Sequence, residues 1–292
     1  MRDTIPALRQ DYKKNQASAN DNRSIDRIIA HYILEHRLAR HLLESDLSDR
    51  AKVYSEVYAE LFRDLPDHPQ AIEKTATRAR RVHTLLALLI PLLGRDKTFL
   101  EVGCGDAVLS AAIAPYAARS YALDVTDALI DRSTMPQNLD CLITSGTEIP
   151  LPERSIDVAL SDQLMEHLHP DDVTAQLKEI FRVLRFGGTY HCITPNRVTG
   201  PHDISRLFGY EASGFHLREY DSSSLLHLFE QAGFRRVRFI VPLGRGFKLP
   251  IARPILRALE KALLSLPRGV RGWAARCRVI GIPAGLHVIA TK

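Results

Sequence analysis

A short apolar run that ends in a carboxylate and two closely spaced glycines is the first feature able to do chemistry. Residues 99–107 read Phe-Leu-Glu-Val-Gly-Cys-Gly-Asp-Ala, so Glu101 precedes a Gly-Cys-Gly turn from Gly103 to Gly105. Glycines at this spacing let the backbone turn sharply after a buried strand and approach a ligand with no Cβ in the way. The next glycine of a dinucleotide fingerprint is missing, because that position is Val108. The pattern therefore favours a ligand that has an adenosine but no phosphates.

A second carboxylate follows at the spacing expected for ribose recognition. Asp124 ends the short apolar segment 120–123 and lies 19 positions after Gly105. Nucleotide-binding sheets place an acidic residue about 20 positions after the glycines, where it accepts hydrogen bonds from ribose hydroxyls. We therefore expect Asp124 to hold a ribose, with charge strengthening both hydrogen bonds.

Three more strands are predicted, and two of them end in polar residues. The strand 140–144 runs into the turn Ser145-Gly146-Thr147, which we expect to border an adenine ring. The strand 155–161 ends in Ser161-Asp162-Gln163, and strand 189–193 follows a helix at 176–184. Because parallel strands end at one edge of a sheet, these polar residues should gather with the glycine turn.

These motifs, in this order, resemble the class I S-adenosylmethionine-dependent methyltransferases, and most closely the group related to quinone-biosynthesis methyltransferases. The resemblance covers about residues 98–240. It departs from the family pattern at Ala107, Ser145 and Phe186, where the family often has Gly, Asp and Pro. The segments that carry it are Glu101-Val-Gly-Cys-Gly-Asp106, Leu123-Asp124-Val125, residues 149–157, Ser161-Asp-Gln-Leu-Met-Glu-His167 and residues 179–188.

The resemblance implies an α/β fold: a Rossmann-like seven-stranded sheet, with the seventh strand antiparallel between the fifth and sixth, and an N-terminal helical cap. It implies S-adenosyl-L-methionine as the cofactor and a transferase function. The expected cofactor-binding residues are Glu101, Gly103, Cys104, Gly105, Asp124, Val125, Ser145, Gly146, Thr147, Ser161, Asp162 and Gln163.

Methyl transfer from a sulfonium needs an aligned acceptor more than it needs an acid, because the leaving thioether is neutral. Alignment of two reactants contributes up to about 7–11 kcal/mol. A hydroxyl acceptor can also need a base, and His167 after the fourth strand is the candidate. The alternatives are His191, His202 and His216, and any of these histidines is equally consistent with a structural role. No metal is expected, because the histidines and acids lack ligand spacing on one element.

The regions outside the motifs predict two accessory parts. Residues 1–23 are polar and expected to be loose, and helices are expected at 24–44, 51–63 and 72–90. We interpret residues 1–95 as a helical cap over the cofactor cleft; a helical layer or dimer surface is the alternative. Residues 96–292 then form the cofactor-binding domain.

The C-terminal part begins with a long connection, 197–221, of the kind that is usually functional or mobile. A helix at 222–232 and a strand at 234–241 follow, and 285–291 reads as the seventh strand. The segment 245–283 is a basic amphipathic insertion. It suits peripheral contact with a membrane, Trp273 being the aromatic anchor, or equally an ordinary surface helix.

Composition limits the class of protein. The chain has 292 residues, 45% hydrophobic and 25% charged, as in a globular protein with one α/β domain and an accessory element. The net charge of +5 is uneven, since residues 235–292 contain 13 Lys or Arg and one acid, which suggests an anionic partner. Four cysteines without paired spacing favour a cytoplasmic protein, and neither a signal peptide nor a transmembrane run is expected.

The function predicted from these features is methyl transfer to a small-molecule acceptor, with O-methylation favoured. Nucleic-acid methylation is an alternative motivated by the basic C-terminal residues. It is disfavoured because Ser161-Asp-Gln-Leu164 replaces the Asn-Pro-Pro-Tyr type of segment found in amino-group methylases. A second alternative is a membrane-associated protein that binds the cofactor without turnover.

Overall fold

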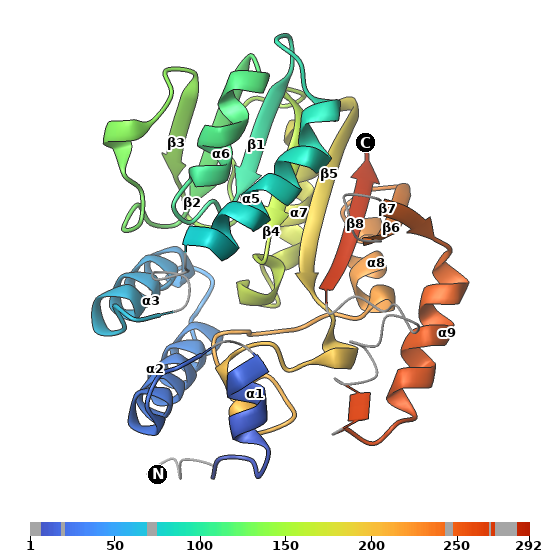
Figure 1. Cartoon of the computed structure of the whole chain (residues 1–292). Helices are drawn as coiled ribbons and strands as arrows, with labels where there is room; N and C mark the ends of the chain where they lie inside the picture. Colours follow the sequence, from blue (N-terminus) through green and yellow to red (C-terminus); the bar gives the residue numbers. More distant parts are fainter. Residues whose placement is uncertain (1–6, 19–20, 69–74, 243–247, 269, 272–284) are drawn as a thin grey trace.

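The fold is organised around one mixed sheet of eight strands in the order β3-β2-β1-β4-β5-β8-β6-β7 (Figure 1). The computed structural model describes residues 7–18, 21–68, 75–242, 248–268, 270–271 and 285–292. The strands are β1 (Thr98–Val102), β2 (Arg119–Asp124), β3 (Leu139–Ile143), β4 (Ile156–Asp162), β5 (Leu184–Pro195), β6 (Arg236–Pro242), β7 (Lys248–Ile251) and β8 (Gly285–Thr291).

The sheet confirms the predicted class and corrects its strand count. Strands β1 to β5 are mutually parallel, and β8 runs antiparallel between β5 and β6, as expected. The additional strand is β7, which pairs antiparallel with β6 at the sheet edge, where Phe239 lies opposite Ile251. The sequence analysis placed these residues inside the amphipathic insertion, because four residues are too few to show an alternating pattern.

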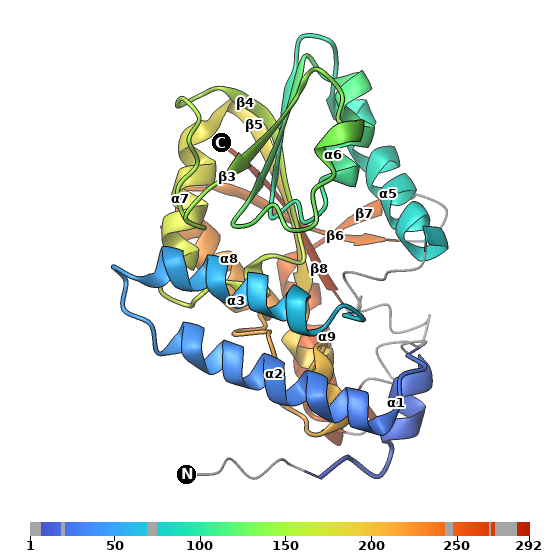
Figure 2. The ribbon, with the colours of Figure 1, turned by 90° about the vertical axis from the view of Figure 1, so that its left-hand side faces the viewer.

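Helices cover both faces of the sheet. Figure 2 shows α5 (Thr75–Leu89) and α6 (Val108–Ile113) on one face, and α7 (Val173–Val183) and α8 (Ser222–Gln231) on the other. Leu85 and Leu89 of α5 share a buried cluster with Phe99 of β1 and Ile113 of α6. Helix α5 is therefore part of a sheet layer, although it lies within the segment 1–95 that the sequence analysis interprets as a cap.

The other N-terminal helices lie across the end of the sheet at which β5 finishes (Figures 1 and 2). They are α1 (Tyr12–Ser18), α2 (Ile25–Leu43) and α3 (Arg50–Asp64). Ser24 caps α2 by accepting from the Arg27 N–H, and the apolar stripe of α2 and α3 joins the main core. Residues 1–23 were expected to be loose, and α1 corrects this for residues 12–18.

The long connection after β5 folds against the cap. Ile204, Leu207 and Phe208 pack on Ile28 and Tyr32 of α2, so the apolar residues of this connection find a partner only in the tertiary structure. Short 3₁₀ turns occur at η1 (Ile90–Leu92), η2 (Ala114–Tyr116), η3 (Arg132–Thr134), η4 (Met165–His167), η5 (Arg197–Thr199) and η6 (Ile204–Leu207).

The basic insertion contains helix α9 (Arg253–Leu264), which lies outside α8 (Figure 1). Leu256 and Leu263 are buried, and buried Glu260 accepts hydrogen bonds from Asn196 and Ser222. Trp273 and the arginines at 276 and 278 lie outside the described residues. Among the helices that the structure describes, none has the length and apolarity needed to cross a membrane.

Candidate active site

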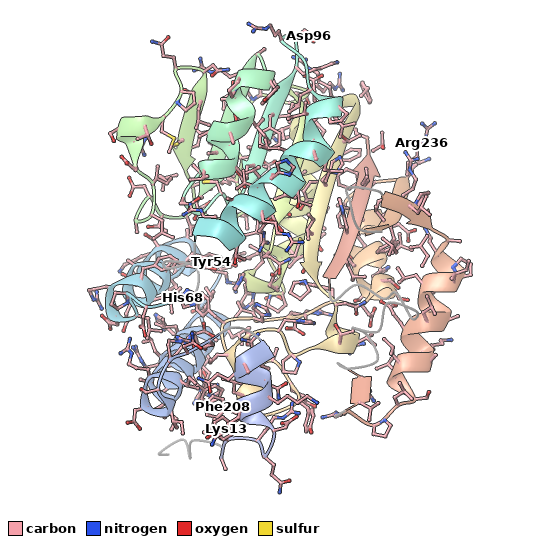
Figure 3. All side chains as sticks on the ribbon, in the orientation of Figure 1. Lys13, Tyr54, His68, Asp96, Phe208 and Arg236 are labelled. Carbon is pink, nitrogen blue, oxygen red and sulfur yellow. The ribbon has the colours of Figure 1, made fainter. Side chains whose placement is uncertain are left out.

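A cavity of about 450 Å³ lies between the carboxyl ends of the parallel strands and the cap. The glycine turn and Asp124 line one side, while residues of α2, α3 and the connection after β5 line the other. Tyr54 and His68 are seen at this junction in Figure 3. The cavity is within the usual range for a small-molecule site.

The glycine turn has the geometry that its sequence predicts. Gly103 and Gly105 have φ of +73° and +57°, which side chains rarely tolerate. Asp124 Oδ2 accepts from the Gly105 N–H at 2.7 Å, and Oδ1 accepts from the Val125 N–H at 2.7 Å. Ala107 also has a positive φ of +58°, which explains why a glycine suits this position. Asp124 thus holds the turn and still presents its carboxylate to the cavity.

Glu101 is buried where β1 meets α6. Its Oε2 accepts a hydrogen bond from Ser110 Oγ at 2.5 Å, and burial raises the pKa of the carboxyl to about 8. Glu101 lines the cavity together with Cys104 and Val125. The side chain therefore both orders the turn and faces the space in which a ligand would lie.

The end of β4 contributes Asp162 and Gln163 to the cavity wall. Arg81 of α5 pairs with both oxygens of Asp162 at 2.7 Å, and Arg78 pairs with Asp106 after the glycine turn. Both arginines line the cavity. The sequence analysis missed them because nothing in a helix before β1 indicates which face will reach a loop after β4.

Three of the expected cofactor-binding residues are not on the cavity wall. Ser161 is fully buried and hydrogen-bonded to Tyr190 Oη at 2.6 Å, because alternate residues of a strand face opposite sides of the sheet. Ser145 and Thr147 flank Gly146, which does line the cavity and accepts at its carbonyl from Gln176 Nε2 at 2.7 Å. The expected cofactor contacts of Ser145, Thr147 and Ser161 therefore stay predictions, whereas the other nine expected residues line the cavity.

Glu166, His167 and His216 meet at the cavity wall, and we call them the strand-end cluster. One ligand-type atom of each lies within 4.8 Å of the other two. His167 Nδ1 donates to the Phe215 carbonyl at 2.9 Å, and His216 Nδ1 donates to Glu219 Oε1 at 2.8 Å. Glu166 Oε2 accepts from Thr194 Oγ1 at 3.0 Å, while its Oε1 is buried with no hydrogen-bond partner.

Burial and charge set the ionisation of the strand-end cluster. Burial raises the pKa of Glu166 to about 7 and lowers the pKa of His167 to about 3. Against the opposing effect of burial, the hydrogen bond to Glu219 and the charge of Glu166 raise the pKa of His216 to about 9. His167 is therefore neutral, with the lone pair on Nε2, since Nδ1 carries the proton that it donates.

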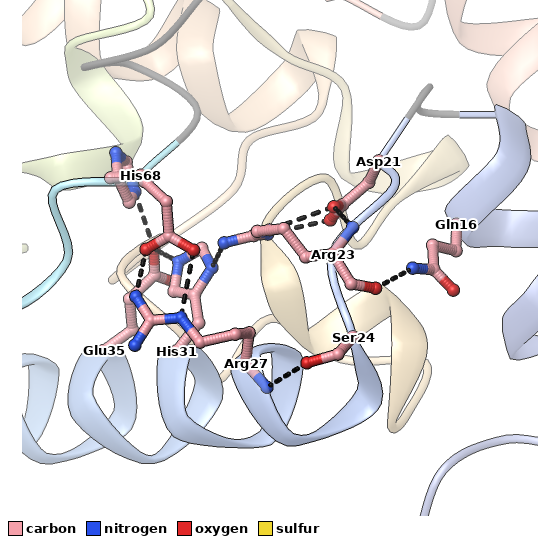
Figure 4. Close-up of polar contacts among 9 residues, drawn as sticks. Gln16, Asp21, Arg23, Ser24, Arg27, His31, Glu35 and His68 are labelled. Carbon is pink, nitrogen blue, oxygen red and sulfur yellow. Dashed lines mark hydrogen bonds and ion pairs between the residues drawn. The ribbon is translucent and has the colours of Figure 1, made fainter.

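A second buried group, the cap cluster, contains His31, Glu35 and His68 (Figure 4). Glu35 Oε1 accepts from His31 Nε2 at 2.6 Å and from His68 Nε2 at 3.2 Å, and Oε2 accepts from the Phe215 N–H. Arg23 Nη1 donates to His31 Nδ1 at 2.8 Å. Although burial opposes it, donation by the two histidines holds the pKa of Glu35 well below its usual range.

Both clusters bear on the expectation that the chain has no metal. That expectation rested on ligand spacing along one element, yet the structure gathers each cluster from two segments. The four-residue spacing of His31 and Glu35 on α2 was a sequence signal that we did not use, whereas His216 approaches Glu166 only through the tertiary fold. Of the alternative histidines, His202 lines the cavity and His191 is buried in β5 away from it.

Known proteins are similar to the part of the chain that contains the glycine turn and Asp124. Residues 100–192 match a family described as "Methyltransferase domain". A Mycolicibacterium smegmatis protein described as a "probable S-adenosylmethionine-dependent methyltransferase" is 38% identical over 144 residues, 48% of this chain and 52% of that protein. A Mycobacterium tuberculosis protein of the same description is 34% identical over 137 residues, covering 46% and 47%. The chain spans about half the length of these curated relatives.

A solved structure supports the fold. It is a chain of the complex between the Haloferax volcanii Trm112 methyltransferase activator and a methyltransferase. It has 16% identity and a TM-score of 0.52 and covers 76% of this chain and 95% of that one. Residues 100–192, which contain the glycine turn and Asp124, are thus similar to the methyltransferase-domain family.

Proposed function

We propose that the protein transfers the methyl group of S-adenosylmethionine to a hydroxyl of a small-molecule acceptor. The observation that carries this proposal is a single cavity that joins the glycine turn to the strand-end cluster beneath the cap. A cofactor at the turn would then point its sulfonium toward an enclosed space that has polar groups on its wall. Such an arrangement suits an acceptor small enough to be covered by α2 and α3.

The cofactor-binding roles follow from which groups line the cavity. Asp124 would accept hydrogen bonds from the ribose diol, and the backbone from Gly103 to Gly105 would pass beneath the cofactor. Val125 and Gly146 would border the adenine. Glu101, Asp162 and Gln163 would lie near the methionine part, with Arg78 and Arg81 of α5 beside them to attract its carboxylate.

The chemistry asked of the protein is chiefly alignment. The acceptor oxygen attacks the methyl carbon, the C–O bond forms, and the C–S bond breaks with its electron pair going to sulfur. Holding the two reactants in line contributes up to about 7–11 kcal/mol. The arrangement of β1, β4 and the cap on both sides of one cavity supports this role.

His167 enters the proposal as a member of the strand-end cluster and not as an isolated base. A neutral imidazole whose pKa is lowered to about 3 is a weak proton acceptor. Its Nε2 lone pair can nevertheless hold the acceptor group. We infer that Glu166, His167 and His216 together mark the acceptor end of the cavity.

A peripheral membrane contact is a second candidate property, favoured by the exposed face of α9. Ile255 is 55% exposed and Leu264 is 43% exposed, and Arg257 and Lys261 of the same helix are also exposed, within one or two turns of Leu264. A helix that exposes both apolar and basic side chains suits an anionic lipid headgroup region. Two further inferences rest on the sequence. The motifs favour membership of the quinone-biosynthesis group, and the unpaired spacing of the cysteines favours a cytoplasmic location.

Calorimetric titration with S-adenosylmethionine and S-adenosylhomocysteine tests the proposal. We expect one site per chain, and Asp124→Ala should weaken binding more than about tenfold by removing charge-assisted hydrogen bonds. Asp127→Ala is the matched control, because Asp127 is exposed and does not line the cavity. Absence of binding to the folded protein would contradict the proposed function. If the cofactor binds, a screen of small hydroxyl compounds for methylation follows.

A further inference from the structure

We propose that Glu166, His167 and His216 bind a divalent transition-metal ion of the Zn²⁺ type, which holds the acceptor hydroxyl in the cavity. This inference rests on the proposed function, because it names the group that positions the acceptor. Two imidazoles and one carboxylate are a ligand set that suits zinc and related ions. Three protein ligands also leave the fourth position open, as catalytic zinc sites require.

The outward-facing atoms of all three side chains are already held. His167 Nδ1 donates to the Phe215 carbonyl, and His216 Nδ1 donates to Glu219. Thr194 donates to one oxygen of Glu166. Outer hydrogen bonds of this kind fix the orientation of metal ligands and direct the remaining lone pairs inward. Here they leave Nε2 of both histidines on the inner side, where a metal ion would bind the lone pair of His167 and displace the Nε2 proton of His216.

The strongest observation in favour of a bound cation is the environment of Glu166. Its Oε1 is buried and has no hydrogen-bond partner among the described residues, and the residue has no exposed surface. A buried carboxylate oxygen without a partner is costly, since desolvation is not compensated. A metal ion in contact with Oε1 would supply the missing partner.

The three ligand atoms of the strand-end cluster would need to move only a little closer together to bind one metal ion. Ligand atoms on tetrahedral zinc lie about 3.3–3.4 Å apart, given bonds of about 2.0–2.1 Å. The three atoms now lie within 4.8 Å of one another. His216 belongs to the connection after β5, outside the helices and strands, so a small shift of this segment toward η4 would close the difference.

The bound ion would act on the acceptor as it acts on water. A zinc ion lowers the pKa of a bound water to about 7, and a bound hydroxyl would be acidified in the same way. The hydroxyl proton leaves to solvent, the oxygen attacks the sulfonium methyl, and the products are the methyl ether and the neutral thioether. The ion is unchanged, so charge and atoms balance.

Titration of the chelator-treated full chain with ZnCl₂, in the presence of S-adenosylhomocysteine, tests this inference. We expect one Zn²⁺ per chain. His216→Ala should weaken Zn²⁺ binding at least 100-fold, and Glu219→Gln should weaken it about 10–100-fold through the outer hydrogen bond. His83→Ala is the control, because His83 is an exposed histidine of α5 outside the cavity.

Each outcome has a distinct meaning. Wild-type protein that binds S-adenosylhomocysteine but no Zn²⁺ would overturn the metal site and leave the proposed function standing. Failure to bind S-adenosylhomocysteine would count against the proposed function itself. Zn²⁺ binding that survives His216→Ala but is lost in His68→Ala would move the ion to the cap cluster and also overturn the inference. If His216→Ala does not fold, Glu219→Gln decides.

Discussion

The cap cluster and the strand-end cluster each contain two histidines and one glutamate. The histidine N–H groups of the cap cluster donate to its own glutamate, whereas the Nδ1–H groups of the strand-end cluster donate to groups outside it. In the cap cluster, both histidines donate from Nε2 to Glu35, and Arg23 occupies Nδ1 of His31 (Figure 4). In the strand-end cluster, both histidines donate from Nδ1 to groups outside the cluster. The first arrangement satisfies its own carboxylate, whereas the second leaves the carboxylate oxygen unsatisfied.

The difference indicates that the cap cluster has a structural role, whereas the strand-end cluster is a ligand site. Glu35 joins α2 to His68 after α3 and to Phe215 of the connection after β5. A Cβ at Gly214 would lie 2.6 Å from Glu35 Oε2, so glycine permits this close approach. Identical side chains therefore acquire different roles through the partner of each ring nitrogen.

The largest expected effect is on stability. Glu35→Gln should lower the free energy of unfolding by about 3 kcal/mol, since it removes the charge from a buried network that relies on it. Glu166→Gln should change it by no more than about 1 kcal/mol in metal-free protein, because one oxygen of that carboxylate is already unpaired. Urea unfolding of both variants at pH 7 measures the two values. Equal losses of unfolding free energy in the two variants would contradict the proposed difference between the two clusters.

The stabilisation by Glu35 should depend on pH. Its pKa is lowered in the folded protein from an ordinary value of 4.5, so its contribution is full above that value. As pH falls below about 4.5, the unfolded chain takes up the proton first and the contribution is lost. The gap between wild type and Glu35→Gln in urea unfolding should therefore narrow from pH 6 to pH 3.5. A constant gap would mean that Glu35 acts through packing alone.

The smallest expected effect concerns the orientation of His31. Arg23→Gln should cost about 1 kcal/mol in urea unfolding, because it removes one hydrogen bond from a charged donor while leaving Glu35 paired. It also frees Nδ1 of His31. If Arg23 is what keeps metal from the cap cluster, calorimetry of this variant should show a second, weaker Zn²⁺ site. Unchanged stoichiometry would mean that the pairing with Glu35 alone excludes the ion.

Much of the fold and half of the site could be predicted from local pattern. The buried strand predicted before the glycine turn was confirmed as β1, and the antiparallel seventh strand was confirmed between β5 and β6. Gly103, Gly105 and Asp124 lie on the cavity wall because each is at the end of a strand or in the turn that follows it. The expected cofactor contact of Ser161 stays a prediction, since the pattern along β4 does not show that this side chain packs against Tyr190.

The acceptor side of the cavity could not be predicted in the same way. Arg81 reaches Asp162 from a helix 81 residues earlier in the chain, and His216 meets Glu166 from the connection after β5. No periodicity or spacing relates such positions. The strand β7 was also missed, because four residues at a sheet edge are recognised by their pairing with β6 and not by their composition.

The sequence by itself determined the cofactor half of this protein, because strand, glycine turn and carboxylate lie close together along the chain and act through local geometry. Only the tertiary structure decided the acceptor half. Whether a buried histidine offers a proton or a lone pair depends on the atom that faces its other nitrogen. For His31 that atom belongs to Arg23, and for His216 it belongs to Glu219, and the packing of the cap against the strand ends sets both.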